Sequence, residues 1–167
     1  FGAYSDSEVI SSILEGLSKL EYRGYDSSGI SILRNNNSIK TIRAKGKLKN
    51  LSKKIKSEDL RGNIGIGHTR WATHGVPSTN NAHPHASEDV SIVHNGIIEN
   101  YSKLKLMLRK KGFKFQSQTD SEVIAHLLSY HLRNNSPKEA IKKTLSSLEG
   151  AFAIAILFKS FNLLAGA

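Results

Sequence analysis

Apolar residues recur at intervals of three and four in five segments of the chain, and this spacing predicts amphipathic helices. Three of these segments follow a Ser-x-x-Glu or Thr-x-x-Glu capping box, whose side chains satisfy free N–H groups at a helix start. The last box also carries Pro137, a residue suited to the first helical position. The predicted helices follow residues 5–8, 119–122 and 136–139, and cover residues 48–55 and 101–111.

Shorter apolar or alternating segments predict strands, and clusters of turn-forming residues separate them. The run Asn35-Asn36-Asn37, for example, is a turn between two predicted strands. The order of elements is helix, strands, helices and again strands. This order indicates an α+β class, in which helices cover sheets that must themselves stack. The predicted strands cover residues 29–34, 38–44, 64–67, 90–94, 151–158 and 161–165.

Composition indicates one globular domain of 167 residues, with 38% hydrophobic residues and only 3 prolines. The absence of cysteine excludes disulfides and thiolate metal sites within these residues. No apolar run approaches the ~20 residues of a membrane-spanning helix. Much of the net charge of +10 lies in residues 40–56. Aromatic residues do not interleave with this basic run, so a strand end and a solvated helix face are favoured over a nucleic-acid surface.

The octet from His68 to Gly75 has the highest density of functional groups, and includes the only tryptophan. It follows the predicted strand 64–67, so the strand delivers polar side chains to its own end. Arg70 offers a planar fork for a carboxylate, and neighbouring Thr and His side chains can add donors. A small carboxylic acid such as an amino acid is the simplest ligand. A polar surface loop with a packed Trp71 is the alternative.

Two further motifs allow both a structural and a functional interpretation. Asn95-Gly96 is a common hairpin-turn pair, but the Asn amide and the Gly N–H group can also form an oxyanion hole. Asp120, at the start of a predicted helix, can be a capping acid or a carboxylate that binds a substrate ammonium group. Taken singly, the turn and the cap are favoured. The polar loop 21–29, with its Arg and two Tyr residues, is weakly favoured as a site wall.

Histidines are concentrated in one part of the chain, so metal binding must be considered. The His83-Pro84-His85 run lacks helical ligand spacing, and no His-Glu-x-x-His motif occurs. Glu122 and His126 share a predicted helix face but lack a third ligand. We therefore expect no metal site. Five of the 7 histidines fall within this region: His68, His74, His83, His85 and His94.

Five blocks of sequence together resemble the glutaminase domain of the isomerising glutamine–fructose-6-phosphate aminotransferases. The resemblance implies an N-terminal-nucleophile hydrolase fold, a four-layer αββα sandwich of antiparallel sheets. It also implies hydrolysis of glutamine to glutamate and ammonia. The ammonia would convert fructose 6-phosphate to glucosamine 6-phosphate in a separate sugar isomerase domain. The matching blocks are residues 20–29, 67–75, 81–85, 93–100 and 119–126.

The resemblance implies a role for several residues that hold the substrate. Arg70, Thr73 and His74 would bind the α-carboxylate of glutamine. Asp120 and the backbone of Gly96 would bind its α-amino group. No cofactor or metal is implied. The complete enzyme of this family is expected to be a cytoplasmic homodimer without nucleic-acid or membrane partners.

The remaining roles concern the reacting carbonyl and the amino terminus. Asn95 and Gly96 would stabilise the oxyanion, and Trp71 would lie in a loop that closes over the substrate. Arg23 and Gly24 would orient the amino terminus. The related amidotransferases of purine, asparagine and glutamate synthesis share the Asn-Gly pair but differ in the amino-acid sequence of the other blocks. They are the alternative within this class.

The two ends of the chain differ from the pattern of the family. The family begins Cys-Gly-Ile-x-Gly, where the Cys is the nucleophile and its own α-amino group is the base. This chain begins at Phe1-Gly2, so we expect the nucleophilic Cys just before Phe1. Residues 1–167 are expected to form the glutaminase domain without its first residues and C-terminal part, and without the sugar isomerase domain. A polypeptide lacking the Cys would be an inactive glutamine-binding module.

Overall fold

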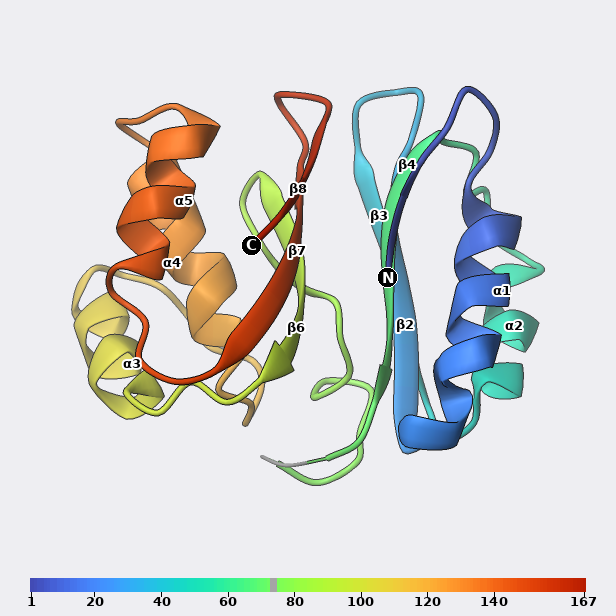
Figure 1. Ribbon diagram of the computed structural model, residues 1–167, viewed down its shortest axis with the longest axis horizontal. Coiled ribbons are helices and arrows are strands. Elements are labelled where there is room, and N and C mark those ends of the chain that lie inside the picture. The colour runs from blue at the N-terminus through green and yellow to red at the C-terminus, as the bar shows by residue number, and fades with distance from the viewer. Residues whose placement is uncertain (73–74) are drawn as a thin grey trace.

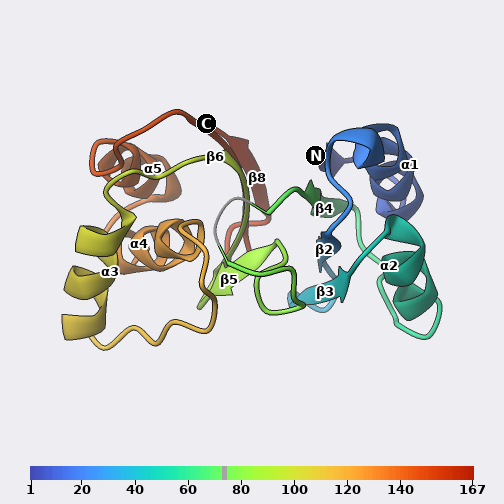
Figure 2. The same cartoon turned by 90° about the horizontal axis from the view of Figure 1, so that it is seen from below.

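The computed structural model describes residues 1–72 and 75–167. Two four-stranded antiparallel sheets stack face to face, and helices cover the outer face of each sheet (Figure 1). The view from below shows the same four layers, with α1 and α2 on one side and α3, α4 and α5 on the other (Figure 2). The predicted four-layer α+β sandwich is therefore confirmed.

The first sheet has the strand order β1-β4-β2-β3 and is covered by α1 and α2. These helices bury their apolar faces on the sheet, and the shared core includes Ile13, Leu17, Ile30 and Ile32. A short 3-10 helix, η1, leads from α1 towards the sheet. The elements are β1 (Gly2–Tyr4), α1 (Ile10–Leu20), η1 (Glu21–Arg23), β2 (Ser27–Leu33), β3 (Ile39–Lys45), α2 (Leu48–Ile55) and β4 (Ile64–Arg70).

The second sheet has the order β5-β6-β7-β8 and is covered by three helices. Its core is the larger one, and α4 contributes Val123, Ile124, Leu127 and Leu128 to it. No helix in the described part of the chain is long and apolar enough to cross a membrane. The elements are β5 (His85–Ser87), β6 (Val90–Gly96), α3 (Tyr101–Lys110), α4 (Glu122–Leu132), α5 (Pro137–Leu145), β7 (Phe152–Phe158) and β8 (Leu163–Gly166).

A third, small apolar cluster joins the inner faces of the two sheets. Ile66 of β4 and Val93 of β6 belong to it and are buried. A buried hydrogen bond of 2.8 Å between the hydroxyls of Ser31 on β2 and Ser91 on β6 also joins the two sheets. The contact between the sheets thus fixes β4 and β6, the two strands that end beside each other at the site described below.

Most predicted elements are present, with two short strands missed. β1 and β5 have three residues each, too few for a visible alternating pattern. β4 extends to Arg70, three residues beyond the predicted end, because His68, Thr69 and Arg70 continue its pairing with β2. The basic run falls on β3 and α2, and the lysines of α2 are exposed as expected of a solvated helix face.

Only one of the three predicted capping boxes is formed. Ser136 is the N-cap of α5, and its hydroxyl accepts a hydrogen bond from the Glu139 N–H group. The prediction at residues 5–8 is wrong, because α1 begins at Ile10 and the Ser5 hydroxyl bonds Ser7 instead. The prediction at residues 119–122 is also wrong, because Thr119 bonds the His85 ring instead.

This difference predicts unequal effects of two Ser→Ala substitutions on stability. Ser136→Ala removes a formed N-cap and is expected to lower the free energy of unfolding by about 1 kcal/mol. Ser5→Ala, the matched control, removes no cap and is expected to leave this free energy nearly unchanged. Urea unfolding followed by circular dichroism measures both. Equal losses in the two variants would contradict the assignment of Ser136 as the cap.

Candidate active site

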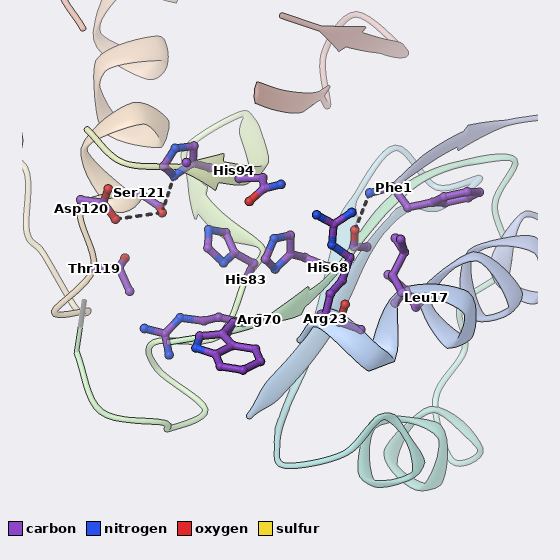
Figure 3. Close-up of a pocket in the computed structure, with 16 residues that line it drawn as sticks. Phe1, Leu17, Arg23, His68, Arg70, His83, His94, Thr119, Asp120 and Ser121 are labelled. Carbon is purple, nitrogen blue, oxygen red and sulfur yellow. Dashed lines mark hydrogen bonds between the residues drawn. The ribbon is translucent and has the colours of Figure 1, made fainter. Parts of the chain in front are cut away.

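A cavity of about 340 Å³ opens where β4 and β6 end (Figure 3). Its wall contains side chains from both sheets and from the start of α4. It brings together most of the predicted site residues, although these lie far apart in the sequence. Those lining the cavity are Arg23, Arg70, Trp71, Asn95, Gly96 and Asp120. Gly24 is buried directly after η1, next to this wall. Thr73 and His74 lie outside the described residues.

Arg70 is buried at the end of β4 and is held by its neighbours. Its guanidinium lies 3.5 Å from the Asp26 carboxylate and donates to the Gly75 carbonyl oxygen at 3.1 Å. Asp26 also accepts hydrogen bonds from the Ala72 N–H group and from the Ser27 hydroxyl. A buried charge is tolerated when it is paired and hydrogen-bonded in this way. The guanidinium is therefore fixed in orientation before any ligand arrives.

Trp71 lies at the opening of the cavity and remains 60% exposed. Its ring packs edge-to-face on Tyr25, with the ring centroids 5.5 Å apart. Tyr25 belongs to the polar loop 21–29, so this loop does contribute to the surroundings of the site. An aromatic pair at a cavity opening offers a large apolar surface close to the charged Arg70.

Asn95 and Gly96 form the last residues of β6 and line the opposite wall. Gly96 has φ +138°, and a Cβ atom there would lie 2.2 Å from the Ala151 carbonyl oxygen, so only glycine fits. The hairpin interpretation is wrong, because the chain continues from Gly96 to α3 rather than turning back. Both residues line the cavity, and their role as an oxyanion hole stays a prediction.

Asp120 lies just before α4 and is only 3% exposed. The N-cap of this helix is Ser121, and the Asp120 carboxylate instead accepts a hydrogen bond from the Ile98 N–H group at 2.9 Å. The Ser121 hydroxyl donates to the other oxygen of the Asp120 carboxylate at 3.3 Å. The interpretation of Asp120 as a helix cap is therefore wrong. The cavity thus has a cation at one wall and a carboxylate at another.

Three histidines that the sequence analysis did not assign to the site also line the cavity. They are His68, His83 and His94 (Figure 3). The ring centroids of His68 and His83 are 4.4 Å apart, and those of His83 and His94 are 6.4 Å apart. The concentration of histidines between residues 68 and 94 was the available signal. Among the described residues, no group of three or more metal-binding side chains is placed to hold a metal ion.

Burial keeps these imidazoles neutral. It lowers the pKa of His68 to about 3, and the nearby His94, His85 and Arg70 side chains act in the same direction. Burial likewise lowers the pKa values of His83 and His94. The His94 ring bonds the Ser121 hydroxyl at 2.8 Å, beside Asp120. The wall between Arg70 and Asp120 thus carries polar groups without additional charge.

Phe1, directly before β1, also lines the cavity (Figure 3). The Phe1 backbone nitrogen donates to the Gly67 carbonyl oxygen at 2.9 Å, and the Gly67 N–H group donates to the Phe1 carbonyl oxygen at 2.8 Å. Phe1 therefore continues the antiparallel pairing of β1 with β4. Arg23 lines the wall beside it.

Two stacked antiparallel sheets between helices, with the amino end of the first strand at a polar cavity, define an N-terminal-nucleophile hydrolase fold. The glutamine phosphoribosylpyrophosphate amidotransferase from B. subtilis, solved with ADP and GMP, superposes with a TM-score of 0.81. That alignment is 28% identical in sequence, covering 95% of this chain and 34% of that one. The chain thus has the fold of the class II glutamine amidotransferases.

A family model described as a glutamine amidotransferase domain matches residues 68–166, and the chain belongs to this family. The isomerising glutamine–fructose-6-phosphate aminotransferase of Mesorhizobium japonicum is 52% identical over 159 residues, 95% of this chain and 26% of that protein. Its counterpart in Clostridium acetobutylicum is 53% identical over 157 residues, 92% and 26% respectively. The chain spans about a quarter of the length of these relatives.

The neutral histidines predict how stability depends on pH. The pKa values of His68 and His85 are lowered to about 3, so the unfolded chain binds protons below about pH 6.5 that the folded chain does not. The free energy of unfolding is therefore expected to have its highest value above about pH 6.5 and to decrease progressively as the pH falls towards 3. Urea unfolding between about pH 7.5 and about pH 5 measures this slope.

The variant His68→Gln is expected to make this slope shallower, because one group that takes up a proton on unfolding is removed. His131→Gln is the matched control, since that ring lies half-buried at the surface of α4 and its pKa is lowered less by burial. A slope in His68→Gln as steep as that of the wild type would show that His68 is not kept neutral.

Proposed function

We propose that residues 1–167 form the glutamine-hydrolysing domain of an isomerising glutamine–fructose-6-phosphate aminotransferase. The observation that carries the proposal is one cavity in which a buried cation, Arg70, and a buried carboxylate, Asp120, flank Asn95 and Gly96. An L-α-amino acid has a carboxylate and an ammonium group, and this charge pair matches them. Sequence identities near 50% to such aminotransferases support the choice of substrate.

In this proposal, glutamine binds through both ends of its α-carbon. Its α-carboxylate pairs with the Arg70 guanidinium, with Thr73 and His74 as further donors. Its α-ammonium group binds Asp120 and the backbone at Gly96. The side-chain carboxamide then points towards Asn95. Trp71 covers the bound substrate from the opening of the cavity.

The nucleophile in this proposal is a cysteine three residues ahead of Phe1. Gly2 pairs with Ile66 in the register of β1 with β4, so added residues would run opposite His68, Thr69 and Arg70, into the cavity. The thiolate attacks the carboxamide carbon, and the resulting oxyanion accepts hydrogen bonds from the Asn95 amide and the Gly96 N–H group. Arg23 and Gly24 orient the amino terminus.

The free α-amine of that cysteine serves as the proton carrier. It takes the thiol proton and gives it to the departing nitrogen, which releases ammonia and leaves a thioester. Water then attacks the thioester with the amine as base, giving glutamate and the regenerated thiol. An α-amino group has an unperturbed pKa of about 8 and can exchange a proton near neutral pH.

We further propose that the ammonia passes to a sugar isomerase domain of the same polypeptide, which forms glucosamine 6-phosphate from fructose 6-phosphate. The support is that the chain aligns with about a quarter of its relatives, so most of each relative lies outside the match. A cytoplasmic homodimer remains our expectation for the complete protein. An inactive glutamine-binding module is the outcome if the polypeptide carries no amino-terminal cysteine.

Ammonia release by the full-length protein tests the proposal. Glutamine is expected to yield ammonia and glutamate, and Asn95→Ala is expected to lower kcat by a factor of about 10²–10³, because one oxyanion donor is lost. The control is Asn80→Ala, an exposed amide away from this cavity, which is expected to retain full activity. Full activity in Asn95→Ala would refute its role, and no ammonia release from the wild type would refute the proposal.

Arg70 is expected to account for most of the recognition of the α-carboxylate. Arg70→Ala should weaken glutamate binding by about 1.5–3 kcal/mol, which is about 10- to 150-fold in Kd, because a charge-assisted contact is lost. Isothermal titration calorimetry measures this change, with circular dichroism to verify the fold. Unchanged affinity in the folded variant would remove Arg70 from the carboxylate site.

A further inference from the structure

Asn81 is a buried amide whose hydrogen bonds join two separate segments of the chain. It is 2% exposed. Its Nδ2 donates to the Val76 carbonyl oxygen at 2.8 Å and to Gln118 Oε1 at 3.0 Å. Its Oδ1 accepts from the Gln118 N–H group at 2.9 Å. Both Nδ2 protons and one Oδ1 lone pair are thus used, so the orientation of this amide is fixed.

The two joined segments carry the two charged groups of the site. Val76 follows Gly75, whose carbonyl oxygen accepts from the Arg70 guanidinium. Gln118 stands two residues before Asp120 in the chain. A continuous series of contacts therefore runs from Arg70 through Gly75 and Val76 to Asn81, and from there to the backbone that leads to Asp120.

The packing around Asn81 leaves little freedom for movement. Gly75 has φ +78°, and a Cβ atom there would lie 2.7 Å from Asn81 Nδ2 and 2.9 Å from Gln118 Cβ. A larger residue would push the two segments apart. The far side is equally constrained, because the Glu122 carboxylate accepts from the Gln116 N–H group at 2.8 Å and from the Ser117 N–H group at 2.7 Å.

We propose that Asn81 is a positioning residue that sets the Arg70 guanidinium relative to the Asp120 carboxylate. This inference rests on the proposed function. A ligand that bears both a carboxylate and an ammonium group on one carbon needs both partners at a fixed separation. A ligand that bears only the carboxylate needs Arg70 alone. Asn81 therefore contributes to selectivity for α-amino acids without touching the ligand.

Two competitive inhibitors of ammonia release by the full-length protein separate these cases. L-glutamate has the α-ammonium group, and glutarate is the same diacid without it. Asn81→Ala is expected to raise the inhibition constant of L-glutamate about tenfold, since the two anchors lose their relative position, and to change that of glutarate less than about twofold. Gln118→Ala removes one exposed partner of the amide and is expected to give a smaller effect with the same selectivity.

Asn80→Ala is the matched control and is expected to leave both inhibition constants unchanged. A merely structural role predicts equal changes for both inhibitors, or a lower kcat from unfolded protein with unchanged constants, and either result would overturn the inference. If Asn81→Ala does not fold, the ratio of the two constants in Gln118→Ala decides alone. Failure of the wild type to release ammonia would instead refute the proposed function, whatever the variants do.

Discussion

The contact of Arg70 with Asp26 is the interaction on which the cavity depends. A guanidinium at the inner end of β4 is stable there only because Asp26, Gly75 and their neighbours replace the water that burial removes. The same carboxylate accepts the Ala72 N–H group and so directs the chain as it leaves the strand. One desolvated ion pair thus contributes both to the path of the backbone after β4 and to the polarity of one wall of the cavity.

The opposite wall follows a different physical rule. Asp120 is held by the Ile98 N–H group and the Ser121 hydroxyl, while the adjacent imidazoles are neutral because burial lowers their pKa values. The three neutral histidines add no charge between Arg70 and Asp120, so the zwitterionic ligand that we propose would meet a positive group at one end and a negative group at the other. Charged histidines at this position would compete with Arg70 for the carboxylate of the ligand.

The architecture and most of the site residues could be predicted from the sequence, but the contacts that hold these residues in place could not. Periodicity identified the helices and longer strands, whereas β1 and β5 were too short to show alternation. Asp120 and Asn95 could be chosen over a cap and a turn only through the combination of motifs, because each alone fits both roles. The involvement of His83 and Asn81 depends on which segments pack together, and local spacing carries no information on that.

The hydrogen bond between Ser31 and Ser91 joins residues that are 60 positions apart, and the cavity beside it likewise draws on both sheets. Neither half of the chain can build this cavity by itself. During synthesis on the ribosome, the first sheet emerges long before α4, so this cavity is absent until the second sheet and the segment before α4 have been made. On the proposed function, competence to bind glutamine therefore arises in one late step, and a fragment released early would release no ammonia.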